Sequence, residues 1–84
     1  MISREIVARQ IEAWLRHQLT LEELVDWAET ALMDGVFPEG DAVLAGVVAR
    51  LGAADVRAFG LTWDDCEQLL SQLGYTARVE ISVA

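Results

Sequence analysis

LTLEELVDWAETALMDG, residues 19–35, carries the signals of a helix from its first residue to its last. Thr20 and Glu23 have the spacing of a capping box, in which each side chain accepts a hydrogen bond from the backbone N–H of the other residue. The leucine before Thr20 can pack back onto the first turn, and the closing Asp-Gly pair is a stop signal. The sequence therefore predicts a helix from about residue 21 to Met33.

The same start signal returns near the end of the chain as LTWDDC, residues 61–66. Thr62 and Asp65 repeat the spacing of the first capping box, and a leucine again precedes the cap. Asp64 and Asp65 also meet the positive end of the helix dipole, where carboxylates are stabilising. Because adjacent helical residues point about 100° apart, these two carboxylates are poorly placed to act as an acid and base pair on one bond. We expect them to start a helix that ends near Gly74.

Two further helices are predicted from caps and apolar spacing. The first begins after Ser3, a good N-cap, and carries two acid-to-arginine pairs four residues apart, Glu5 with Arg9 and Glu12 with Arg16. The other is AVLAGVVARLG, residues 42–52, which follows the possible N-cap Asp41 and ends at Gly52, a candidate for the left-handed C-terminal position. The stretch AADVRAFG at residues 53–60 predicts one or two further helical turns.

These segments predict one mainly α domain over residues 1–84, helical over 3–74, with a bundle of four to five helices. Short connections favour antiparallel neighbours. The apolar positions of the helices give the expected core, which consists of Ile6, Val7, Ile11, Leu15, Leu24, Ala28, Leu32, Val43, Leu44, Val47, Leu51, Leu69, Leu70 and Leu73.

The tail YTARVEISVA, residues 75–84, alternates apolar and polar residues and is rich in β-branched side chains. This pattern predicts one C-terminal β-strand that pairs outside the helical core. A single strand leaves its backbone groups unpaired, so its partner is an irregular segment of the chain, a foreign sheet edge or the same strand of a second copy. Pairing with a second copy requires no other protein, so we predict a homodimer. Its strand residues are Tyr75, Arg78, Val79, Glu80, Ile81 and Val83.

The net charge is −8, from six arginines and fourteen acidic residues. Such a surface repels nucleic acid and anionic lipid and attracts basic protein surfaces. The opening MISREIVARQ has no apolar core of signal-peptide length, and no apolar run approaches the length of a membrane span. We expect a cytoplasmic protein that binds neither nucleic acid nor membrane.

Catalytic and metal motifs are weak in this sequence, so we expect a protein that is not an enzyme and has no cofactor or metal. Cys66 is a candidate nucleophile, but acidic neighbours raise a thiol pKa and the only histidine, His17, is far away in the sequence. We therefore expect Cys66 to be a buried cysteine in the apolar series of the last helix. The six glycines have no phosphate-binding spacing.

Partner-binding residues are predicted on two kinds of surface. Glu22, Asp26 and Glu29 share one helical face and could attract a basic partner. Trp27 and Trp63 are candidates for aromatic contacts, since tryptophan is enriched among the residues that dominate interface energies.

The stretch LTLEELVDWAETAL, the acidic excess and the short chain together resemble the small bacterial immunity proteins, which neutralise a toxin domain by binding it. The resemblance covers about the first half of the chain, and TLEELVDWAE is its most specific part. It implies a one-to-one inhibitor that presents carboxylates to a basic toxin surface and has no catalytic residues. The YTARVEISVA tail departs from the all-helical members of that group.

Two functional hypotheses follow. The first is a small acidic protein-protein interaction module, immunity-like or otherwise, that binds a basic protein. The second is a self-associating regulatory or structural homodimer built through the C-terminal strand.

Overall fold

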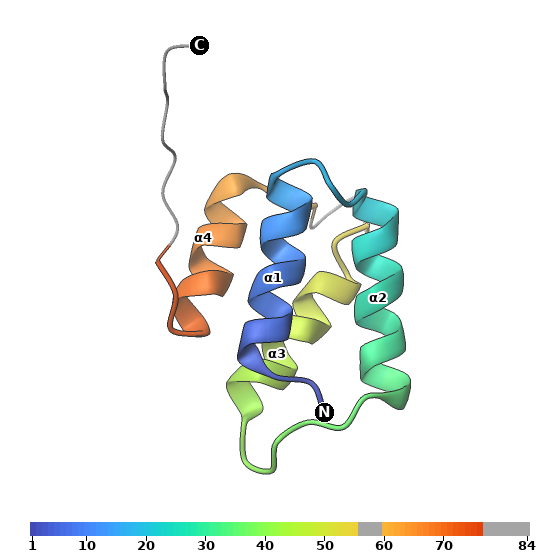
Figure 1. Ribbon diagram of the computed structural model, residues 1–84, viewed down its shortest axis with the longest axis vertical. Helices are drawn as coiled ribbons and strands as arrows, with labels where there is room; N and C mark the ends of the chain where they lie inside the picture. The colour runs from blue at the N-terminus through green and yellow to red at the C-terminus, as the bar shows by residue number, and fades with distance from the viewer. Residues whose placement is uncertain (56–59, 77–84) are drawn as a thin grey trace.

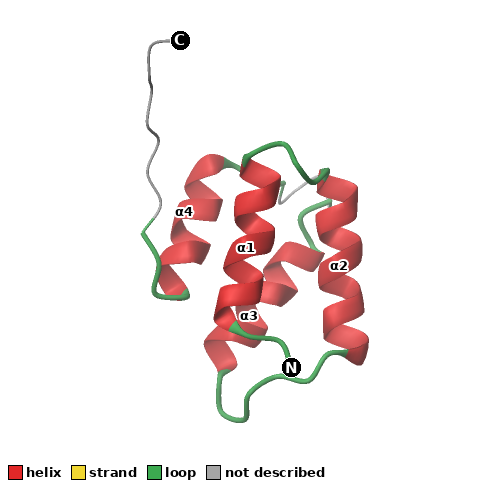
Figure 2. Ribbon diagram, viewed as in Figure 1, coloured by secondary structure: helices red, strands yellow, loops and turns green. Residues whose placement is uncertain are grey.

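The computed structural model describes residues 1–55 and 60–76 and contains four helices in that part of the chain (Figures 1 and 2). They are α1 Arg4–Leu15, α2 Leu21–Asp34, α3 Ala42–Gly52 and α4 Trp63–Gln72. The prediction of a mainly α chain is confirmed. Of the predicted helical turns at 53–60, residues 53–55 form a turn and 56–59 lie outside the described residues.

Each helix begins at the cap that the sequence predicts. Ser3 Oγ accepts a hydrogen bond from the backbone N–H of Ile6 at 3.2 Å. Asp41 Oδ1 accepts one from the backbone N–H of Leu44 at 3.1 Å. Both capping boxes are formed, and they start α2 and α4. Local hydrogen bonding therefore fixes where all four helices start.

In Figure 1, α1 lies between α4 and α2, and α3 runs obliquely behind it. The chain rises through α1, descends through α2, and descends again through α4, so α1 is antiparallel to both of its neighbours in the view. The closest packing joins α2 to α3. The beginnings of α2 and α4 therefore lie at the same end of the molecule as the end of α1.

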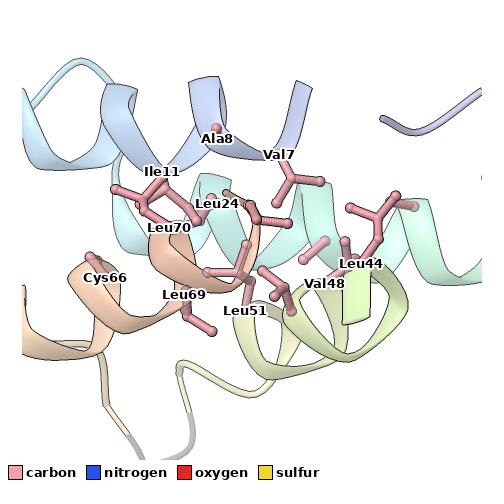
Figure 3. Packing of buried hydrophobic residues seen from close by; sticks show 14 residues of the cluster. Val7, Ala8, Ile11, Leu24, Leu44, Val48, Leu51, Cys66, Leu69 and Leu70 are labelled. Atoms are coloured by element: carbon pink, nitrogen blue, oxygen red, sulfur yellow. The ribbon is translucent and has the colours of Figure 1, made fainter. Parts of the chain in front are cut away.

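The core is apolar and receives side chains from all four helices (Figure 3). Most of the predicted core positions are buried, and Leu15 packs against the cluster while half-buried. Three predicted positions are wrong: Ile6, Leu32 and Val43 are 39%, 43% and 44% exposed. The buried set also includes Cys66, in agreement with its place in the apolar series of the last helix, and five residues that the prediction left out, namely Ala8, Val25, Ala31, Val48 and Ala54.

The physical reason for these errors is that small residues occupy the contact faces. On α1 and α2 the buried stripes include Ala8 and Ala31, which let neighbouring helices approach closely, and the larger Ile6 and Leu32 lie at the edges. The expected faces of α1 and α2, chosen by helical spacing, are therefore slightly rotated from the observed ones. On α3, Val43 lies outside the buried stripe, which consists of Leu44, Val47, Val48 and Leu51.

Gly52 does not take the predicted left-handed C-terminal position. It is the last residue of α3, the positive backbone φ values in the described chain lie elsewhere, and Ala53 is the C-cap. A Cβ atom at position 52 would lie 3.4 Å from Leu32 Cδ1 and 3.9 Å from Ala28 Cβ. These are ordinary van der Waals separations, so neither the backbone conformation nor the packing on α2 requires glycine at position 52.

At the end of the molecule opposite the two capping boxes, Arg4 joins three helices. Its Nε and Nη2 atoms donate to the two carboxylate oxygens of Asp41, each at 3.0 Å, and Nη1 donates to the backbone oxygen of Gln72 at 3.4 Å. The start of α1 is thereby held to the start of α3 and the end of α4. Two-point contact of this kind also fixes the orientation of the guanidinium.

Candidate functional site

Helix α2 carries an acidic face made of Glu22, Asp26 and Glu29, as the sequence predicts. All three residues are exposed. Within residues 1–55 and 60–76, none of them enters an ion pair. The whole helix contains five acidic residues and no basic one, so nothing on α2 itself compensates this charge.

Helix α1 differs, because its acidic residues are paired. Arg9 contacts Glu5 at 2.9 Å and Arg16 contacts Glu12 at 3.8 Å, both at the predicted spacing of four residues. Between α3 and α4, Arg50 lies 3.4 Å from Asp65. Together with the Arg4 pair, these contacts place every described arginine beside a carboxylate outside α2.

The two predicted aromatic contacts occupy different surroundings. Trp27 is half-buried and packs against the core from α2. Trp63, the first residue of α4, is half-buried and lines a groove at the end of the molecule where α2 and α4 begin. The structure therefore does not bring Trp27 and Trp63 into one aromatic site.

The groove has a volume of about 470 Å³ and opens to solvent. The end of α1, the connection to α2 and the first residue of α4 form it, and its lining residues are Trp14, Leu15, His17, Leu19, Thr20 and Trp63. Trp14, Leu15 and Leu19 also pack against the core. The floor of the groove is therefore apolar and continuous with the core.

His17 turns the chain at the edge of this groove. Its backbone φ is 61°, in the left-handed region that residues other than glycine seldom adopt, although histidine does so more often than most. The turn lets the chain leave α1 and reach the capping box of α2 within four residues. No signal in the sequence marks His17, Trp14 or Leu19 as parts of one site, because the groove forms only when α4 packs beside α1.

The groove is flanked by the acidic first turns of α2 and α4. Two of these carboxylates are held in capping boxes. The backbone N–H of Thr20 donates to Glu23 at 3.1 Å, and that of Thr62 donates to Asp65 at 3.0 Å. These hydrogen bonds lower the pKa of both carboxyls, and Arg50 lowers the pKa of Asp65 further. Both side chains are therefore anionic well below neutral pH.

Cys66 lies under this end of the molecule and is fully buried. Burial raises the pKa of its thiol to about 11, and the neighbouring Asp65 carboxylate adds to the rise. At neutral pH the thiol is protonated and shielded from solvent, whereas a nucleophilic cysteine needs an accessible thiolate. Cys66 is a core residue in this structure, as expected from the sequence.

Metal ligands do not gather in the part of the chain that the structure describes, where no three His, Cys, Asp or Glu side chains lie together as a metal site would require. None of the helices there combines the length and apolar character needed to cross a bilayer. Tyr75 is exposed and lies outside the helices, whereas Arg78, Val79, Glu80, Ile81 and Val83 fall in residues 77–84, outside the described residues.

Comparisons of the chain with protein-family models, with curated proteins and with solved structures found no match.

Proposed function

We propose that this chain is a non-enzymatic protein-binding module that presents the acidic face of α2 to a basic protein. The observation that carries the proposal is the clustering of uncompensated charge on one helix face. Glu22, Asp26 and Glu29 are exposed on a helix that has no basic residue, and none of them enters an ion pair in the described chain, whereas the exposed and unpaired Glu39, Asp55 and Glu67 lie on separate segments. Uncompensated charge of one sign on one face is what steers a partner of opposite charge.

The rest of the chain supports the same proposal. A net charge of −8 adds long-range attraction to any basic surface and repulsion from nucleic acid. A buried, protonated cysteine offers no nucleophile. An immunity-like inhibitor, which covers a basic toxin surface one to one, is the form of this function that the pattern of residues 19–32 favours.

The test uses charge reversal at the acidic face with a control of equal net charge. The test variant carries Glu22→Lys, Asp26→Lys and Glu29→Lys. The control reverses three other exposed carboxylates outside α2, at Glu39, Asp55 and Glu67. Immobilised wild-type chain is used to isolate the partner from extracts of the source cell, and the purified partner is then measured against all three proteins.

We expect the α2 variant to slow association at least tenfold and the control to slow it much less, because steering depends on charges near the contact. Association with the wild type should also slow as salt rises, since exposed charges are screened over about 8 Å at physiological ionic strength. Equal effects of the two triple variants would contradict the proposal, since net charge alone would then explain binding.

Self-association through residues 75–84 stays a prediction. Light scattering on the full chain and on a chain ending at Gly74 tests it directly. A dimer that becomes a monomer on truncation would support it, and a monomeric full-length chain would contradict it.

A further inference from the structure

We infer that the groove between α1 and α4 receives an apolar side chain of the partner that is flanked by arginine or lysine. This inference rests on the proposed function, because it assigns a docking position to the same basic partner. The groove adjoins the acidic face directly: Thr20 lines it, and Glu22 is the second residue of the helix that Thr20 caps. A partner segment seated there continues onto α2.

The lining of the groove fits an apolar anchor. Four of its residues are large and apolar, namely Trp14, Leu15, Leu19 and Trp63, and all four are half-buried. The volume of about 470 Å³ lies within the range of about 300–1,000 Å³ that ligand sites occupy. Tryptophan at the centre of an apolar patch is a common energetic centre of protein interfaces, and its ring also attracts guanidinium and ammonium groups.

The rim of the groove selects a cation and not an anion. The N-termini of α2 and α4 together carry about one positive charge. Against it stand four first-turn carboxylates, Glu22, Glu23, Asp64 and Asp65. Adding the Arg50 guanidinium beside Asp65 still leaves the rim negative. Glu22 and Asp64 are exposed and enter no ion pair in the described chain, so they are available to the flanking basic residues.

Charge also argues against a second copy of this chain as the occupant of the groove. Each copy brings a net charge of −8, and apposed like charges oppose association. The described arginines of a second copy already lie beside carboxylates of their own chain. A basic segment of another protein meets none of these obstacles.

Three short blocked peptides test the inference on the full wild-type chain. RRLRR combines the anchor with basic flanks, RRGRR lacks the anchor, and EELEE reverses the flanks. Binding is followed by NMR through the three tryptophan indole N–H signals. Trp14 and Trp63 report on the groove, and Trp27, which does not line it, is the internal control.

We expect RRLRR to shift the indole signals of Trp14 and Trp63 saturably while Trp27 stays unchanged. RRGRR should bind about tenfold more weakly, because the leucine side chain is no longer buried. EELEE and inorganic sulfate should produce no shift at millimolar concentration. A response to sulfate or EELEE as strong as the response to RRLRR would overturn the assignment of a cationic partner. The absence of any groove shift with RRLRR would overturn the groove itself.

Variants at the rim and floor sharpen the test. Asp64→Asn should weaken RRLRR binding by about twofold to fivefold, the range for one exposed ion pair. Its control Asp34→Asn, at the far end of α2, should leave binding unchanged. Trp63→Gln should remove the preference for RRLRR over RRGRR, and Leu19→Gln provides the same comparison should the tryptophan variant melt without a cooperative transition. Equal binding by Asp64→Asn and Asp34→Asn, or a preference retained in the floor variants, would contradict the inference.

These outcomes separate the groove from the proposed function. If adding the peptide shifts only the backbone amide signals of α2 around Asp26 and Glu29, the assignment of the groove as a docking site is wrong. The acidic face would then remain the binding surface. Loss of the natural partner on reversing the α2 charges, with unchanged partner binding by Trp63→Gln, would likewise overturn the groove alone. If the triple charge reversal on α2 does not slow association with the natural partner, the proposed function is wrong. This holds for any result of the peptide experiments.

Discussion

The two helix starts at residues 19–24 and 61–66 share a sequence pattern and a hydrogen-bond pattern but differ in what surrounds them. In each, a threonine hydroxyl accepts a backbone hydrogen bond at 3.1 Å and an acidic side chain accepts one from the threonine N–H. The first box has no ion pair in the described chain, whereas Asp65 in the second lies 3.4 Å from Arg50. The residue after each box is fully buried, but it is Leu24 in one and Cys66 in the other. The shared pattern sets local structure, and the neighbours decide what else each start contributes.

The largest expected effect tests the buried position after the first box. Leu24→Ala should lower the free energy of unfolding by about 2–5 kcal/mol, because it leaves a cavity in the core. Leu32→Ala, on the same helix but 43% exposed, should cost about 1 kcal/mol or less. Urea denaturation of both variants measures the difference. Equal losses would mean that the buried face of α2 has been misassigned.

The corresponding position after the second box is titratable. Folding raises the pKa of the Cys66 thiol from its ordinary value of 9.0 to about 11. The folded state therefore binds the thiol proton more tightly than the unfolded state, and deprotonation destabilises the fold. The contribution of the protonated thiol to the free energy of unfolding is fully present below about pH 9. It is lost as pH rises from about 9 to about 11, and the total loss is about 3 kcal/mol. Cys66→Ala should lack this alkaline loss, and Leu24→Ala should keep it. Denaturation at pH 8 and pH 11 checks this, and parallel pH profiles for wild type and Cys66→Ala would refute it.

The capping threonines should contribute similarly at the two starts. Thr20→Ala and Thr62→Ala should each cost about 1 kcal/mol, since a backbone N–H loses its acceptor. Thr30→Ala, an exposed position within α2, should be neutral or slightly stabilising because alanine favours helix. Thermal unfolding of the three variants provides the comparison. A neutral Thr62→Ala would indicate that the second helix is held by packing alone.

The smallest expected effect separates the acidic members of the two boxes. Both carboxyl pKa values are lowered on folding, so their stabilisation is present above about pH 4 and is lost as pH falls below it. Glu23→Gln and Asp65→Asn should therefore lower the melting temperature at pH 7 and converge with wild type near pH 2. Asp65→Asn should have the larger effect, because it also removes the charge beside Arg50. The reverse order would make the Arg50 contact unimportant.

The sequence alone is sufficient to predict where the helices begin, because those starts are determined by contacts within one helical turn. Ser3, Thr20, Asp41 and Thr62 are all recognisable as caps, because a cap and its partner lie three residues apart. The core is less predictable, since the burial of Ala8 and Ala31 and the exposure of Ile6 depend on how closely the helices pack. Periodicity marks an apolar stripe but does not give its exact rotation.

The candidate site is predictable only in part for the same reason. The acidic face of α2 follows from helical spacing, and Trp63 is a natural choice as an aromatic contact. Its association with Trp14 cannot be foreseen, since the two residues are far apart in sequence and meet through packing of α4 beside α1. The left-handed backbone at His17, which shapes the groove, also has no local signal strong enough to predict it.

The contact of Arg4 with Gln72 has a consequence for synthesis on the ribosome. The two residues are 68 positions apart, so at about 5–20 residues per second the N-terminal helix emerges roughly 3–14 s before its partner. During that interval the face of α1 that packs on α4 has no neighbour to cover it. The four-helix packing is complete only after α4 has emerged, so the emergence of this helix is the step that determines whether α1 obtains its full set of neighbours.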